Sequence, residues 1–165
     1  MAPPIILPTV PLRHSARAIV VDSAERILLL RFHPPHATPF WLTPGGGLEG
    51  DEPYETALRR ELREEVGLSE PEIGPCVWLR DHTFPFRGGM LRQKERYFLV
   101  RCAPFEVRPE FSEEVLRAEG VLGHRWWTLP EMESTAETLV PGRLAPLLTA
   151  LLREGASAEP FDCGI

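Results

Sequence analysis

This sequence has no closely spaced cysteine pairs, no excess of basic residues and no long apolar run, and each absence argues against a class of protein. The cysteines Cys76, Cys102 and Cys163 are odd in number and widely spaced, so neither a disulfide framework nor a zinc site is expected. Basic residues do not outnumber acidic ones, and a net charge of −6 argues against a partner that is a nucleic-acid polymer or an anionic membrane. No apolar run approaches the roughly 20 residues of a membrane span, so we expect a cytoplasmic protein.

What is present is the composition of a globular protein. The 165 residues are 43% hydrophobic and 25% charged, a size and balance typical of one domain with one core. We expect a proline-rich N-terminal arm at 1–14, which does not resemble a signal peptide, a single domain at 15–154 and a loose tail at 155–165.

Runs of β-branched and aliphatic residues alternate with helical patterns along the chain. One β-hairpin is predicted at 16–32, a second at 76–101, and a further strand at 124–129 after an acidic segment. A helix is expected after Pro53, with Gly67 as its stop, and another at 141–154. This order of elements predicts an α/β domain in which helices cover a mixed sheet.

The helix after Pro53 has an apolar stripe of Leu58, Leu62 and Val66 at about 100° per residue. Its glutamates border that stripe, whereas its arginines occupy the opposite, solvated arc. The glutamates are Glu61, Glu64 and Glu65; the arginines are Arg59, Arg60 and Arg63. Carboxylates at i, i+3 and i+4 repel one another, more so when partly desolvated. A hard divalent cation removes that repulsion, and oxygen ligands suit Mg²⁺ or Mn²⁺.

The segment Gly46 to Leu68, GGLEGDEPYETALRRELREEVGL, resembles the Nudix box: a glycine, five residues, a glutamate, seven residues, then R-E-aliphatic-x-E-E-x-G-aliphatic. All nine defining positions match: Gly46, Glu52, Arg60, Glu61, Leu62, Glu64, Glu65, Gly67 and Leu68. The resemblance implies an α/β/α sandwich with a mixed β-sheet between helices.

The resemblance also implies an activity, the hydrolysis of a pyrophosphate bond in a nucleoside diphosphate linked to another group X. Glu61, Glu64 and Glu65 would bind Mg²⁺ or Mn²⁺ together with a backbone carbonyl near Gly45 or Gly46. Glu52 and Arg60 would pair to fix the loop against the helix. The general base is left open between Glu61 or Glu64 and a residue of the acidic segment, namely Glu113, Glu114 or Glu119.

Two other functions compete with hydrolysis. A Nudix module that binds a nucleotide or sugar-nucleotide as a sensor would be expected to lose box glutamates, and this chain keeps them. A prenyl-diphosphate isomerase would need a catalytic cysteine motif, which Cys76 and Cys102 do not provide. The partner is therefore expected to be a small nucleoside diphosphate derivative, and a homodimer formed by exchange of the arm is a further expectation.

Outside the box the candidate residues carry weaker signals. The tryptophans on predicted strands are better explained by core packing than by base stacking. The arginines on predicted strands are explained about equally well by phosphate binding and by surface ion pairs. Histidines near loops are expected to have no task, and Pro85 is not sufficient to assign ADP-ribose as substrate. These residues are Trp41, Trp126, Trp127, Arg31, Arg80, Arg96, His33, His36 and His82.

Overall fold

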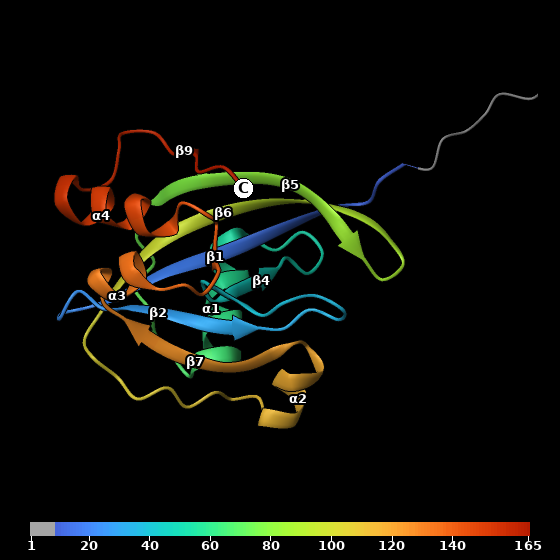
Figure 1. The fold of residues 1–165 in the computed structure, drawn as a ribbon, viewed down its shortest axis with the longest axis horizontal. Coiled ribbons are helices and arrows are strands. Elements are labelled where there is room, and N and C mark those ends of the chain that lie inside the picture. Colours follow the sequence, from blue (N-terminus) through green and yellow to red (C-terminus); the bar gives the residue numbers. More distant parts are fainter. Residues whose placement is uncertain (1–8) are drawn as a thin grey trace, which may run out of the picture.

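The computed structural model describes residues 9–165 (Figure 1). The strands are β1 (Leu12–Asp22), β2 (Ile27–Phe32), β3 (Phe40–Leu42), β4 (Gly45–Gly47), β5 (Cys76–Phe86), β6 (Gly89–Cys102), β7 (Val121–Trp127), β8 (Leu139–Val140) and β9 (Phe161–Asp162). The helices are α1 (Tyr54–Val66), α2 (Glu113–Ala118), α3 (Leu129–Ser134) and α4 (Leu144–Glu154). None of the described helices is long and apolar enough to cross a bilayer.

The strands form one mixed sheet in the order β8-β3-β2-β1-β6-β5-β9, with β4 paired to β1 and β7 to β2. The two predicted hairpins are present as the antiparallel pairs β1/β2 and β5/β6. They are joined by a long parallel pairing of β1 with β6, in register from Leu12 opposite Arg92 to Asp22 opposite Cys102. This central pairing fixes the position of every residue at the start of β1.

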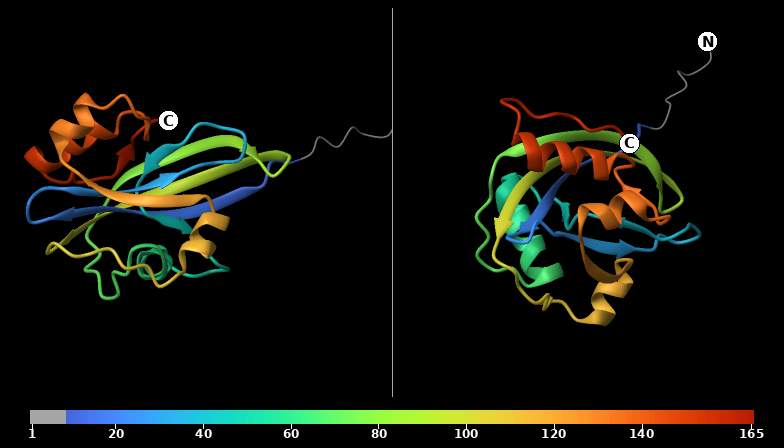
Figure 2. Two further views of the ribbon diagram at one scale, coloured as in Figure 1. Left: turned by 60° about the horizontal axis from the view of Figure 1, so that its bottom comes forward. Right: turned by 60° about the vertical axis from the view of Figure 1, so that its left-hand side comes forward.

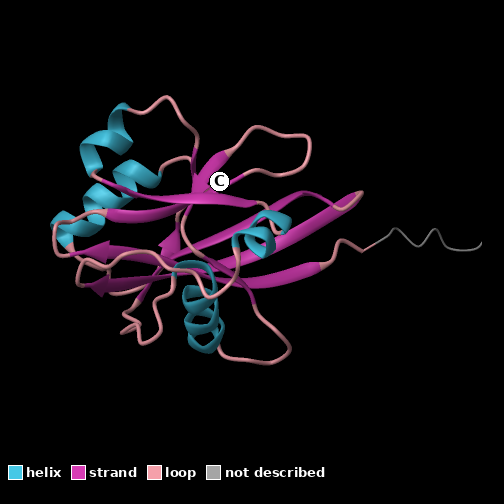
Figure 3. Cartoon of the chain, turned by 90° about the horizontal axis from the view of Figure 1, so that it is seen from below, coloured by secondary structure: helices cyan, strands magenta, loops and turns pink. Residues whose placement is uncertain are grey.

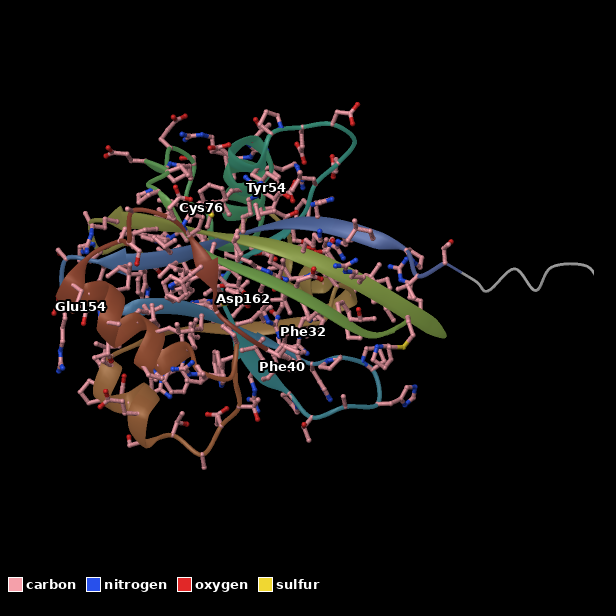
Figure 4. The ribbon with its side chains drawn as sticks, turned by 90° about the horizontal axis from the view of Figure 1, so that it is seen from above. Phe32, Phe40, Tyr54, Cys76, Glu154 and Asp162 are labelled. Carbon is pink, nitrogen blue, oxygen red and sulfur yellow. The ribbon has the colours of Figure 1, made fainter. Side chains whose placement is uncertain are left out.

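Each face of the sheet is covered by helices, which confirms the α/β/α sandwich. Helix α1 lies on one face and α3 and α4 lie on the other, as Figures 2 and 3 show. Alternate residues of β1 serve the two cores: Ala18 and Val20 pack with α1, whereas Ile19 and Val21 pack with α4. Figure 4 shows Tyr54, at the start of α1, and Glu154, at the end of α4, on opposite sides of the sheet.

Helix α1 forms where its sequence signals predict it. Pro53 is the extended residue directly before the helix, and Gly67 ends it in the left-handed conformation at φ 76°. Gly67 also lies against the Arg108 carbonyl, and a β-carbon there would be 2.0 Å from that oxygen. Leu58, Leu62 and Val66 are fully buried. The predicted apolar stripe is therefore the stripe that holds α1 on the sheet.

Several elements differ from the sequence expectations. Strand β1 begins at Leu12, inside the expected arm, because its main chain pairs with β6. Residues 1–8, which make up most of the arm expected to be exchanged in a dimer, lie outside the described residues. The tail is not loose throughout, since β9 pairs with β5 and Cys163 is 3% exposed. The glycines at 45–47 form a strand, β4, that was not predicted, and helices α2 and α3 were not predicted either. Each of these elements has six residues or fewer, too short for a readable periodicity.

Candidate active site

The glycines of β4 bring the strand into direct contact with α1. Gly45 donates its backbone N–H to Oε2 of Glu65 at 2.9 Å. At Gly46, a β-carbon would lie 2.5 Å from the carboxylate carbon of Glu61, so a side chain there would displace the Glu61 carboxylate from its present position. Two of the three predicted carboxylates therefore meet the backbone of the predicted loop.

Arg60 connects the loop, the start of the helix and two glutamates. Its Nη2 donates to Glu52 at 2.7 Å and to the Gly47 carbonyl at 3.2 Å. Its Nη1 donates to Glu61 at 2.8 Å and lies 3.8 Å from Glu64. The guanidinium is thus turned into the site and makes the pair with Glu52 that the resemblance implies. Its placement on the solvated arc from helical geometry was wrong, because the long side chain reaches back across the helix to the loop carboxylates.

The three carboxylates are in an environment that disfavours their charge. Burial raises the pKa of Glu65 to about 8, and the charge of Glu61 adds to this effect against the opposing hydrogen bond from Gly45. Burial also raises the pKa of Glu61, although Arg60 opposes the shift. The pKa of Glu64 is raised by desolvation and then by Glu61. Burial therefore favours the protonated form of Glu65 at neutral pH, and a bound cation would favour the charged form instead.

The carboxylate oxygens of these glutamates are the donor type that a divalent cation prefers, but the side chains do not point at a common centre. Within residues 9–165, no three His, Cys, Asp or Glu side chains are already arranged to enclose an ion. Glu61 is directed at Arg60 and Glu65 at the Gly45 N–H. The donors are nevertheless all oxygens on one helix and its adjoining loop, and burial disfavours their charged forms, which Mg²⁺ or Mn²⁺ would stabilise.

Comparison with known proteins identifies the source of this arrangement. The family model described as NUDIX domain matches residues 11–150. The chain belongs to the Nudix family. An RNA pyrophosphohydrolase of Acidiphilium cryptum is 28% identical over 170 residues, covering 92% of this chain and 94% of that relative. An 8-oxo-dGTP diphosphatase of Proteus vulgaris is 36% identical over 77 residues, covering 45% of this chain and 66% of that relative.

The fold agrees with solved Nudix structures. A MutT NUDIX hydrolase from Burkholderia pseudomallei superposes with a TM-score of 0.61 at 25% identity, covering 81% of this chain and 95% of that chain. The predictions of the family and of a Nudix pyrophosphohydrolase are confirmed at this level of description.

The three general-base candidates in the acidic segment beyond the Nudix box differ in their surroundings. Glu119, the residue that ends α2, adds its charge to those that raise the pKa of Glu61 and Glu65, after larger contributions led by burial. Glu113 lines a cavity of about 300 Å³ that Glu65 also lines, but it is paired with Arg117 at 2.8 Å. Glu114 is exposed. Of the three, Glu119 is the one that acts electrostatically on the glutamates of the box.

Sequence reasoning missed a buried ionic cluster on the face of the sheet opposite α1. Glu95 is 2% exposed and accepts hydrogen bonds from Arg17 at 2.8 Å and from Arg80 at 3.0 Å. Gln93 and Tyr97 also donate to it. Burial alone would raise the pKa of Glu95, but the charge of Arg17 and hydrogen bonds from His82 and Arg17 hold it well below its usual range. Charged residues spaced by two on a strand were the available signal.

Arg17 ties this cluster to the Nudix loop. Its Nη1 donates to the Gly45 carbonyl at 2.9 Å while its Nε donates to Glu95. Gly45 is therefore held from both faces of the sheet, by Arg17 through its carbonyl and by Glu65 through its N–H.

The remaining candidates are dispersed. Trp41 and Trp127 pack edge to face in the α4-side core and Trp126 packs against Phe105, which confirms core packing for the tryptophans. Arg31 lies over the ring of Trp41 and Arg96 over that of Tyr54. His33 and His36 are exposed, and Pro85 is paired with Met90 within the β5/β6 hairpin.

Proposed function

We propose that this Nudix protein hydrolyses the diphosphate bond of a nucleoside diphosphate derivative with Mg²⁺ or Mn²⁺. The observation that carries the proposal is the carboxylate of Glu65. It is 8% exposed and adjoins Glu61, and within residues 9–165 no arginine, lysine or histidine lies at ion-pair distance from it. With a pKa of about 8 this carboxyl is largely protonated at neutral pH without a counter-ion, and a bound cation would stabilise its charged form. A box that has retained all its glutamates favours the enzyme over the sensor.

In this proposal Glu61, Glu64, Glu65 and the Gly46 carbonyl hold the cation. A cation bound there would neutralise the diphosphate and lower the pKa of bound water. The pair of Glu52 and Arg60 keeps the loop and helix at a fixed separation. Water attacks one phosphorus and gives a proton to the general base, the bridging P–O bond breaks, and the departing phosphate carries away the bonding electrons.

Among the open candidates for the general base, we propose Glu119, because its charge reaches Glu61 and Glu65. Replacing Glu119 by glutamine is expected to lower kcat by about 10²- to 10⁴-fold, the range for loss of a positioned base. Steady-state kinetics of E119Q beside E113Q and E114Q measure this, and the latter two are expected to keep normal rates. Unchanged turnover by E119Q would instead assign the base to Glu61 or Glu64.

The substrate class is tested by a panel that varies group X. Purified protein is incubated with nucleoside triphosphates, 8-oxo-dGTP, NDP-sugars, ADP-ribose, dinucleoside polyphosphates and coenzyme A, with Mg²⁺, Mn²⁺ or a chelator. A 5′-triphosphorylated RNA oligonucleotide is included because the Acidiphilium relative is named an RNA pyrophosphohydrolase.

We expect release of phosphate, pyrophosphate or nucleotide from at least one small molecule, abolished by the chelator and restored by Mg²⁺. Cleavage of the RNA alone would contradict the small-molecule assignment. Nucleotide binding without cleavage of any compound would support the sensor. Cleavage that persists in the chelator would contradict metal dependence.

A further inference from the structure

The first residues of β1 place an arginine directly on the Nudix loop. Strand β4 pairs antiparallel with β1, with Ser15 opposite Gly47, so Arg13 extends along the same face of the strand toward Gly47. A β-carbon on Gly47 would lie 2.3 Å from Nε of Arg13 and 2.8 Å from its Nη2. The absence of a side chain at Gly47 therefore makes the space in which the Arg13 guanidinium lies.

Arg13, an exposed residue, differs from Arg17 and Arg80 in having no acidic partner. Arg17 and Arg80 both bond to Glu95, whereas no carboxylate in residues 9–165 lies within 4.0 Å of the Arg13 guanidinium. Desolvation lowers the pKa of Arg13, the charge of Arg17 lowers it further, and the charge of Glu61 opposes both. Arg13 is thus an unpaired cation within electrostatic reach of a glutamate of the box.

Strand β4 has an open edge beside Arg13 at which an anion can bind. In the described part of the chain β4 pairs only with β1, so its other edge has no strand partner. Gly46 faces Glu61 on the α1 side, and Gly47 faces Arg13 on the opposite side. An anion at this edge would have the carboxylates that hold the cation on one side and a guanidinium on the other.

We propose that Arg13 binds a phosphoryl oxygen of the substrate diphosphate, and this inference rests on the proposed function. A guanidinium presents parallel N–H donors that match a phosphate, and its charge is permanent. Because Gly47 has no side chain, the Arg13 guanidinium can lie against its backbone. In a chain of net charge −6, an arginine kept free of acidic partners beside the acidic box supplies the attraction that an anionic substrate needs.

The test uses R13Q, R13K and the control R153Q, which changes an exposed arginine of α4 with no ion pair to any described residue. With the best substrate of the panel, R13Q is expected to lower kcat/KM by about 10- to 100-fold, mainly through KM, as for loss of a charge-assisted hydrogen bond. R13K is expected to recover part of the loss, and R153Q to match the unmodified protein.

A second variant disturbs the contact between Arg13 and Gly47 by changing the glycine. Gly47→Ala introduces a methyl group where Nε of Arg13 lies, at a backbone position without positive φ. It is expected to raise KM in the unmodified protein and to have little further effect in R13Q, because the two changes remove one interaction.

A binding measurement separates this proposal from the proposed function. Calorimetric titration with inorganic pyrophosphate and Mg²⁺ is expected to show at least tenfold weaker binding to R13Q than to R153Q, a change that damage to folding alone, checked by melting temperature, would not produce selectively. Equal pyrophosphate affinity and equal KM in R13Q and R153Q would overturn the role of Arg13 while leaving the hydrolase intact. Failure of the unmodified protein to cleave any panel compound would overturn the proposed function, and pyrophosphate affinity would still decide for or against Arg13.

Discussion

Replacement of Glu64 by glutamine is expected to lower kcat/KM by roughly 1000-fold, equivalent to about 4 kcal/mol of transition-state stabilisation. Glutamine keeps the size of the side chain but removes the charge that we propose holds the cation. The folded state should lose little, because Glu64 is partly exposed and its one ion pair, with Arg60, is 3.8 Å long. The measurement is steady-state kinetics with Mg²⁺ alongside thermal unfolding.

The matched control for this prediction is Glu55→Gln on the same helix. Glu55 is exposed in the first turn of α1 and has no ion pair with any described residue, so E55Q is expected to keep near-normal activity. Near-normal activity of E64Q with Mg²⁺ would remove Glu64 from the site. An equal loss in E55Q and E64Q would show that helix charge in general, and not a ligand position, controls the rate.

Replacement of Glu95 by alanine is expected to destabilise the fold by about 3–5 kcal/mol. Glu95 is the shared acceptor of Arg17 and Arg80, whose side chains are 15% and 8% exposed. Without it, two guanidinium groups face each other in a largely buried space with no acid between them. Urea unfolding measures the free energy directly, and the melting temperature should fall by roughly 10 °C.

The control for Glu95 is Glu106→Ala, because the pair of Glu106 and Arg108 is solvent-exposed and should contribute less than about 1 kcal/mol. The effect should also depend on pH. Since the folded-state pKa of Glu95 lies well below its usual range, the stability it contributes is present above the unfolded pKa of about 4.3 and is lost as pH falls further. The two proteins should therefore converge in acid. A loss below 1 kcal/mol at neutral pH would show that water solvates the two arginines.

The proposed metal site could be inferred from the sequence because its residues are close together in the chain. Gly46, Glu52, Arg60 and the three glutamates fall within 20 residues, on one loop and one helix whose period fixes their relative directions. The contacts of Gly46 with Glu61 and of Gly45 with Glu65 agree with that reasoning. Helical geometry alone did not predict the orientation of Arg60, because it places the Cα and the flexible side chain then follows its acidic partners. The resemblance did imply the pair with Glu52.

The groups around the box could not be predicted, because distant segments supply them. Arg17 and Glu95 are separated by 78 residues and meet only through the parallel register of β1 with β6. Arg13 reaches Gly47 through the pairing of β1 with β4, at a position that the sequence placed in a proline-rich arm. Non-local strand pairing carries no short-range sequence signal, so these residues appear only when the sheet is known.

The most direct test of the central claim is to count divalent ions on the protein without substrate. Titration with Mn²⁺, followed by the electron paramagnetic resonance signal of the free ion, is expected to reveal a saturable site on the unmodified protein. The variant with glutamine at positions 61, 64 and 65 should leave the ion free, provided it retains its fold by circular dichroism. Equal Mn²⁺ binding by the folded triple variant would contradict the claim that these three glutamates gather to hold the metal.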